Sequence, residues 1–147
     1  MKHVLAFAFT AAAVGMFVGM APTRAQTKTP VINVTVNYTG KSTVSEKTPI
    51  WVFLFNTPIA NAQSQPLAFK RLPKNGGAVQ FEYGGTAPIY VFVALDTKGG
   101  YDPASAPPAA GSPIGNYTVD GKTAAAVKVM PVTNVKVTFN DAVVFKQ

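Results

Sequence analysis

The chain of 147 residues contains no cysteine, and its only histidine is His3, close to the N-terminus. The protein therefore has no thiol nucleophile and no thiolate metal ligand. Removal of residues 1–25, argued below, takes the histidine away as well, and with it the usual general base at neutral pH. These absences argue against catalysis and against a transition-metal site, so we expect no enzyme activity and no cofactor.

Acidic side chains are scarce, at six against 13 lysines and arginines. No pair of carboxylates lies in a setting that predicts one raised and one lowered pKa, as a glycosidase needs. The only basic cluster is Lys70, Arg71 and Lys74. Nucleic-acid binding usually needs a basic stripe with interleaved aromatic residues, so we expect no nucleic-acid partner.

The first residues have the order of a secretory signal peptide. Lys2 precedes an apolar run over residues 4–20, and Thr23 and Ala25 are small residues before the predicted cut between Ala25 and Gln26. A retained membrane anchor is the alternative, because the run is nearly long enough to span a bilayer. We expect residues 1–25 to form a signal-peptide helix that meets the membrane only before cleavage, and the product to be secreted or periplasmic.

Residues 26–147 are expected to form one domain. Loss of Lys2 and Arg24 leaves a net charge of about +5. About 120 residues suffice to bury a core without disulfides. An exported domain without cysteine fits a bacterial periplasm or exterior better than a eukaryotic secretory route.

Apolar residues in this domain follow a period of two. Both faces are apolar in Ile50–Asn56 and in Ile89–Leu95, which predicts two central strands. Further strands are expected at Val31–Thr39, Leu67–Leu72, Ala78–Tyr83, Ala124–Met130 and Asn134–Phe139, with Ala142–Phe145 extending the sheet or lying along it. No sustained period of 3.6 occurs. The sequence therefore predicts an all-β fold, a single antiparallel β-sandwich of seven or eight strands.

Two connecting segments have clear signals. Asn75-Gly76 between alternating runs predicts a β-hairpin. Residues 97–117 are rich in proline, glycine, alanine and serine, and Pro103, Pro107 and Pro108 exclude a helix, so we expect this segment to be irregular.

The order of these segments resembles transthyretin-like, or carboxypeptidase-regulatory-like, β-sandwich domains of bacterial secreted proteins. The matching pieces are Pro49–Phe55, Pro88–Asp96, the loop Thr97–Asp102 and the closing strand Val135–Asp141. The resemblance implies an immunoglobulin- or transthyretin-like sandwich. It also implies a role in folding, adhesion or carbohydrate contact.

The candidate binding surface is aromatic. If the two central strands are neighbours, one face carries a continuous patch formed by Trp51, Phe53, Phe55, Tyr90 and Phe92. An exposed patch of this kind marks a partner surface. Alternatively, one face of the two strands is the intersheet core and the other is covered by the proline-rich segment Asp102–Tyr117.

Asp96 and Asp102 flank a glycine-containing loop and are a weak candidate for calcium binding. Calcium needs six to eight oxygen ligands, whereas Lys98 and glycines fill this loop. Asp96 is equally well placed to end a strand and cap the following turn.

Together these observations predict an exported, non-enzymatic binding module. Its partner is an unidentified protein or cell-envelope component that contacts the aromatic face or an open sheet edge. The alternative is a saccharide-binding module that uses Trp51 and Tyr90 as its stacking platform.

Overall fold

The computed structural model describes residues 28–58 and 63–146, so the predicted signal peptide and its helix lie outside the described residues. The described part is all-β and contains no helix, and hence none that is long and apolar enough to cross a membrane. It has seven strands: β1 (Val31–Tyr38), β2 (Ile50–Phe55), β3 (Ala68–Leu72), β4 (Ala78–Glu82), β5 (Tyr90–Leu95), β6 (Ile114–Asn116) and β7 (Val132–Phe139).

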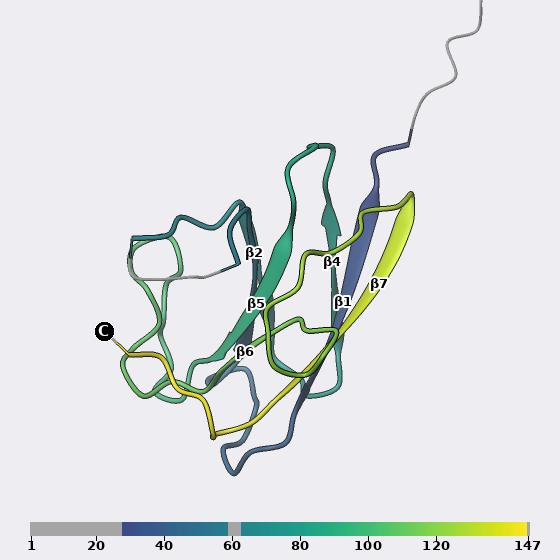
Figure 1. The fold of residues 1–147 in the computed structure, drawn as a ribbon. Coiled ribbons are helices and arrows are strands. Elements are labelled where there is room, and N and C mark those ends of the chain that lie inside the picture. The colour runs from purple at the N-terminus through teal and green to yellow at the C-terminus, as the bar shows by residue number, and fades with distance from the viewer. Residues whose placement is uncertain (1–27, 59–62, 147) are drawn as a thin grey trace, which may run out of the picture.

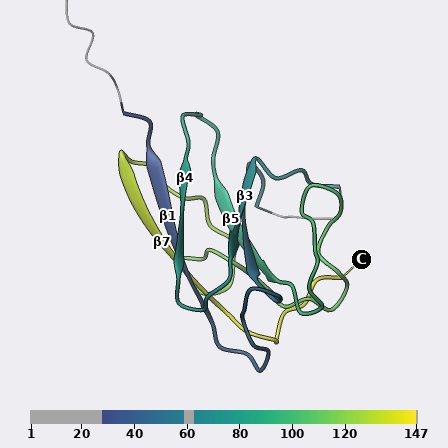
Figure 2. The same ribbon diagram turned by 180° about the vertical axis from the view of Figure 1, so that it is seen from behind.

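The strands form two sheets that face each other, the arrangement of a β-sandwich (Figures 1 and 2). One sheet has the order β4-β1-β7 and the other the order β3-β2-β5-β6. The two strands with apolar residues on both faces, β2 and β5, are adjacent in the middle of the four-stranded sheet, which confirms them as central strands. Figure 1 shows irregular segments over the outer face of this sheet.

Alternating apolar residues build the core between the sheets. In β1 the side chains of Ile32, Val34, Val36 and Tyr38 are buried, while the residues between them are only partly buried. They pack against the inward side chains of β2 and β5, including Ile50, Val52, Leu54, Val91, Val93 and Leu95. The period-two pattern therefore predicted which face of each long strand is buried.

The prediction of a purely antiparallel sandwich is wrong for one pair of strands. β1 and β7 are parallel, and they pair over their full length from Val31 with Val132 to Tyr38 with Phe139. Alternation decides which face of a strand is buried, but it does not specify the direction of a neighbour far away in the sequence.

The Asn75-Gly76 turn does not form the predicted hairpin, because β3 and β4 belong to different sheets. The chain reverses at Gly76, whose positive φ of 72° suits glycine. Asn75 then binds the backbone of β1: its Oδ1 accepts from the N–H of Tyr38 at 2.7 Å, and its Nδ2 donates to the carbonyl of Tyr38 at 2.7 Å. The turn therefore carries the chain from one sheet to the other.

Two further boundaries differ from the expectation. The proline-rich segment 97–117 contains the short strand β6, which pairs with β5 at Phe92–Ala94. In contrast, Ala124–Met130 forms only two isolated bridges, Thr118 with Ala124 and Ile89 with Val127. Val127 is the only fully buried side chain of that segment, so little apolar area holds it in a sheet.

Candidate functional site

The five predicted site residues share the outer face of β2 and β5. The antiparallel register pairs Phe53 with Phe92 and Phe55 with Tyr90, while Trp51 is opposite Ala94. The rings of Phe53 and Phe92 are 5.8 Å apart, and those of Phe55 and Phe92 are 6.1 Å apart. The strands are therefore neighbours, as the sequence predicted, and the aromatic residues lie on one face.

Much of this face is covered rather than open. Phe53, Phe55 and Phe92 are only 3%, 6% and 5% exposed. They form a second apolar cluster, outside the intersheet core, with Ala94 and with Phe145 from the C-terminal segment. Of the two alternatives, coverage by the proline-rich segment therefore describes these three phenylalanines, and no broad exposed aromatic patch forms here.

Trp51 and Tyr90 are both partly buried, but they lie at opposite ends of the paired strands. Four residues of strand separate their levels, which corresponds to about 13 Å. They do not form a joint platform. The aromatic neighbours of Trp51 are instead Phe69 of β3 and Tyr101, each with its ring centroid 6.0 Å away and edge-on.

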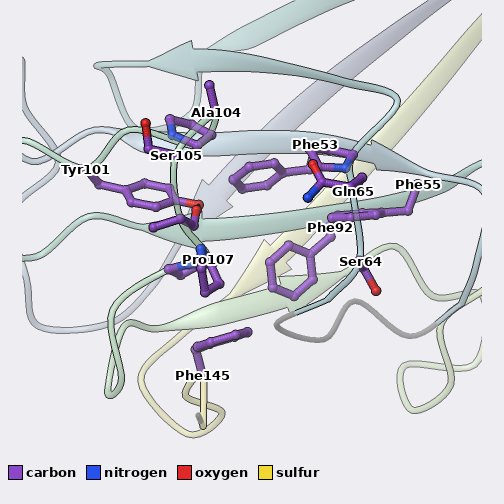
Figure 3. A pocket seen from close by; sticks show the side chains of 14 residues that line it. Phe53, Phe55, Ser64, Gln65, Phe92, Tyr101, Ala104, Ser105, Pro107 and Phe145 are labelled. Carbon is purple, nitrogen blue, oxygen red and sulfur yellow. The ribbon is translucent and has the colours of Figure 1, made fainter.

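The covering segments leave a hollow of about 130 Å³ on this face, lined mostly by apolar residues together with Ser64, Gln65 and Ser105 (Figure 3). Phe53, Phe55 and Phe92 line it from the sheet, and Phe145 and Tyr101 project into it from two other segments (Figure 3). Its remaining walls are residues 64–66 and 103–108. Three of the latter are prolines, which fix the backbone without adding hydrogen-bond donors.

A second hollow, an open groove of about 460 Å³, has a different lining. Trp51 and Tyr101 are its aromatic residues, and charged residues surround them: Glu46, Lys47, Arg71, Asp96 and Lys98. Arg71 Nη1 pairs with Glu46 Oε2 at 2.6 Å, the one ion pair found within residues 28–58 and 63–146. The indole Nε1 of Trp51 is buried and has no hydrogen-bond partner among the described residues.

Asp96 caps the turn that follows β5, the alternative to calcium binding considered from the sequence. Its Oδ1 accepts from the backbone N–H groups of Lys98 and Gly99, at 3.2 and 2.8 Å, and its Oδ2 accepts from that of Tyr101 at 2.9 Å. Asp102 accepts from the hydroxyl of Ser105 and from the N–H of Ala104, and these hydrogen bonds lower its pKa. Both carboxylates therefore shape the loop. The described residues contain no group of three or more potential metal ligands of the His, Cys, Asp or Glu type.

Tyr101 lines both hollows, so they adjoin at this residue. Its hydroxyl donates to the carbonyl of Ala106 at 3.0 Å and so ties the start of the proline-rich loop to its middle. Burial raises the pKa of Tyr101 to about 12, and the negative charges of Asp102 and Asp96 add to the rise. Tyr101 therefore stays neutral at physiological pH.

The basic cluster seen in the sequence is dispersed by the fold. Lys70 and Arg71 are consecutive in β3 and so point to opposite faces: Arg71 pairs with Trp51 on the outer side, and Lys70 pairs with Val52 on the inner side. Lys70 Nζ lies 5.6 Å from the centre of the Phe81 ring. Lys74 belongs to the turn after β3.

Sequence reasoning did not include Tyr101 or Phe145 in the site. Both lie in irregular segments, where alternation carries no information on facing. The available signals were that Tyr101 is the one aromatic residue near the start of the proline-rich segment, and that Phe145 ends the apolar run Ala142–Phe145.

Comparison of the chain with protein-family models, with curated proteins and with solved structures gave no match. The resemblance to transthyretin-like domains therefore stays a prediction. Function has to be argued from the site itself.

Proposed function

We propose that this protein is an exported, non-catalytic β-sandwich module that binds a protein or cell-envelope partner through the outer face of its four-stranded sheet. The observation that carries the proposal is the hollow of about 130 Å³ lined by Phe53, Phe55, Phe92 and Phe145. Packed interiors keep few voids larger than a water molecule, and apolar pockets with a few polar groups are the usual form of a binding site.

The composition supports a binding role over catalysis. After residue 25 the chain has neither histidine nor cysteine, and both aspartates near the site are engaged in capping the loop. Apolar and aromatic area is what remains available, and such area provides binding energy rather than proton transfer.

Site-specific photo-crosslinking tests the partner surface. A benzoylphenylalanine at Ala104, an exposed residue on the rim of the hollow, should yield a crosslinked product of one defined mass in the envelope fraction of the native host. The same probe at Lys136, exposed on the outer face of the other sheet, is the matched control. Equal products from both positions, or none from Ala104, would contradict the proposal.

Export is part of the proposal and has its own test. N-terminal sequencing of the protein from culture medium or periplasm should begin at Gln26, within a few residues. Recovery of the intact chain in the membrane fraction would instead identify residues 4–20 as a retained anchor.

A saccharide is the second candidate ligand, favoured by one observation: partly buried Trp51 lies in a groove with polar and charged walls. Aromatic rings beside hydrogen-bonding groups suit the apolar and polar parts of a sugar. In affinity electrophoresis, Trp51→Ala should then lose retardation by the bound polysaccharide. Tyr90→Ala should keep it, because Tyr90 lies at the other end of the strands. Equal loss in both variants would contradict a groove-bound sugar.

We also propose that the sandwich is of the transthyretin- or immunoglobulin-like kind. The two-sheet arrangement with β2 and β5 in the centre supports this. The parallel pairing of β1 and β7 is the feature by which this sandwich departs from a purely antiparallel one.

A further inference from the structure

The two hollows lie end to end along β2. The apolar hollow is over Phe53 and Phe55, and the groove is over Trp51, two residues earlier in the same strand. Residues 64–66 line the hollow, Arg71 of β3 lines the groove, and the loop from Lys98 to Pro108 contributes to both. Tyr101 lines both hollows, so they adjoin at this residue, and the two together are called the trough below.

The chemistry of the trough differs between its ends. The end over Phe53 and Phe55 has a volume of about 130 Å³, similar to the roughly 150 Å³ of a cavity that holds a benzene molecule, so its size suits one ring or one branched aliphatic side chain. The groove end is lined by three cationic side chains, Lys47, Arg71 and Lys98, and by two carboxylates, so the cations are in excess, and both carboxylates already have partners. Glu46 pairs with Arg71, and Asp96 accepts three backbone N–H groups.

The positive charges of the groove are less engaged. Lys47 and Lys98 line it, and neither forms an ion pair with another described residue. Arg71 has further guanidinium N–H groups besides the one that binds the Glu46 carboxylate; one of them donates to the Glu46 carbonyl. The groove therefore complements a negative ligand group, in a domain whose net charge is about +5.

The positions of the two hollows along β2 match an extended peptide that runs beside this strand. Side chains at i and i+2 of an extended chain point to the same side and are about 6.6 Å apart, which equals the step from Phe53 to Trp51 in β2. We infer that the partner of this site is a protein segment in extended conformation that places a bulky apolar side chain in the hollow and a carboxylate, two residues away, in the groove. This inference rests on the proposed function and specifies its ligand.

Titrations followed by amide NMR test the inference on the protein without residues 1–25, because all seven strands of the described part lie after that segment. The probes are end-capped heptapeptides with phenylalanine, glycine and aspartate in the centre, in both orders, since the structure does not set the direction. One order should shift the signals of Trp51, Phe53 and Tyr101. Replacing the phenylalanine by serine, or the aspartate by asparagine, should weaken binding about tenfold.

Protein variants provide the matched control. Lys98→Glu should weaken binding of the acidic peptide about tenfold and leave the asparagine peptide unchanged. Lys136→Glu changes the net charge equally, but on the outer face of the other sheet, and should have little effect. Equal effects of the two variants would show that only overall charge matters, and would overturn the inference.

The remaining outcomes separate the inference from the proposed function. If oligogalacturonate produces the shifts and neither peptide order does, the ligand is an anionic saccharide and the inference is wrong. If neither peptide binds but the probe at Ala104 still crosslinks one partner, the peptide chemistry is wrong and the partner surface stands. If both experiments fail, the proposed function fails with the inference.

Discussion

At the scale of single residues, the aromatic face contains two kinds of ring. Phe53 is 3% exposed, and truncation of such a buried ring to alanine costs about 3–5 kcal/mol. Trp51 is only partly buried, and its indole N–H is buried without a described partner, which costs about 1–3 kcal/mol. Burial therefore stabilises the two rings unequally.

Trp51→Phe tests this difference. The variant loses ring area but also removes the unsatisfied N–H, so we expect its free energy of unfolding to change by less than about 1 kcal/mol. Phe53→Ala should lose about 3–5 kcal/mol in the same urea titrations. A loss in Trp51→Phe as large as that in Phe53→Ala would show that the indole N–H has a partner, such as an ordered water.

Tyr101 gives the protein a pH dependence at high pH. Its pKa in the folded protein is about 12, against about 10 in an unfolded chain. The unfolded state therefore binds fewer protons between these values, so stability is complete below about pH 10 and is lost as pH rises toward 12.

The expected result is a decrease in unfolding free energy over this range that is smaller in Tyr101→Phe. Urea unfolding at several pH values measures it, with tyrosinate absorbance as a direct titration. The pKa of Tyr38 is also raised, by burial and by its hydrogen bond to Asp141. Part of the decrease in unfolding free energy with pH should therefore remain in Tyr101→Phe. Identical slopes in the wild-type protein and in Tyr101→Phe would refute the assignment.

At the scale of elements, β6 and β7 approach closely because of one glycine. A Cβ placed on Gly115 would lie 2.5 Å from the Cβ of Phe139. That atom is fixed to the backbone of β7, so it cannot move away as the end of a flexible side chain would.

Gly115→Ala should therefore lower the unfolding free energy by about 1–3 kcal/mol, the usual cost of overpacking. Gly84→Ala is the matched control, because its nearest neighbour would be Thr29 Cγ2 at 3.8 Å, an ordinary contact. Thermal unfolding of the two variants makes the comparison. Equal transition temperatures would mean that the strands separate at little cost.

The elements also show what the sequence could predict. Alternation located β1, β2, β5 and β7 and their buried faces, since a period of two is a property of the strand itself. It did not predict that Asn75-Gly76 connects different sheets, because a tight reversal is the same whichever strand the chain joins next. The partner of that turn is the backbone of Tyr38, far away in the sequence.

In the candidate site, too, alternation predicted some features and left others open. The shared face of Phe53, Phe55 and Phe92 could be predicted, because it depends only on alternation and on the pairing of two apolar strands. The segments that cover that face could not be predicted from the sequence. Tyr101 and Phe145 come from irregular segments, and their positions depend on long-range backbone contacts such as the bond from the Phe145 N–H to the Ser112 carbonyl.

At the scale of the whole molecule, the two sides of the sandwich end differently. On one side the edge of β6 is extended by the C-terminal segment, where Pro113 bridges Val144 and the Ile114 N–H donates to the Val143 carbonyl. On the other side β3 and β4 are the edge strands of their sheets. Unpaired strand edges are the places where copies of a chain associate.

Lys70 is placed to oppose such association. It is the inward-pointing residue in the middle of β3, next to the Phe81 ring, and a lysine there has to be accommodated by any strand that adds to this edge. Lys70→Val should therefore increase self-association in sedimentation velocity experiments over a wide range of concentrations. Lys74→Val, which removes the same charge in the turn after β3, should sediment like the wild-type protein, because that residue is outside the strand. If Lys70→Val sediments like Lys74→Val, then the shortness of β3, and not the lysine, protects this edge.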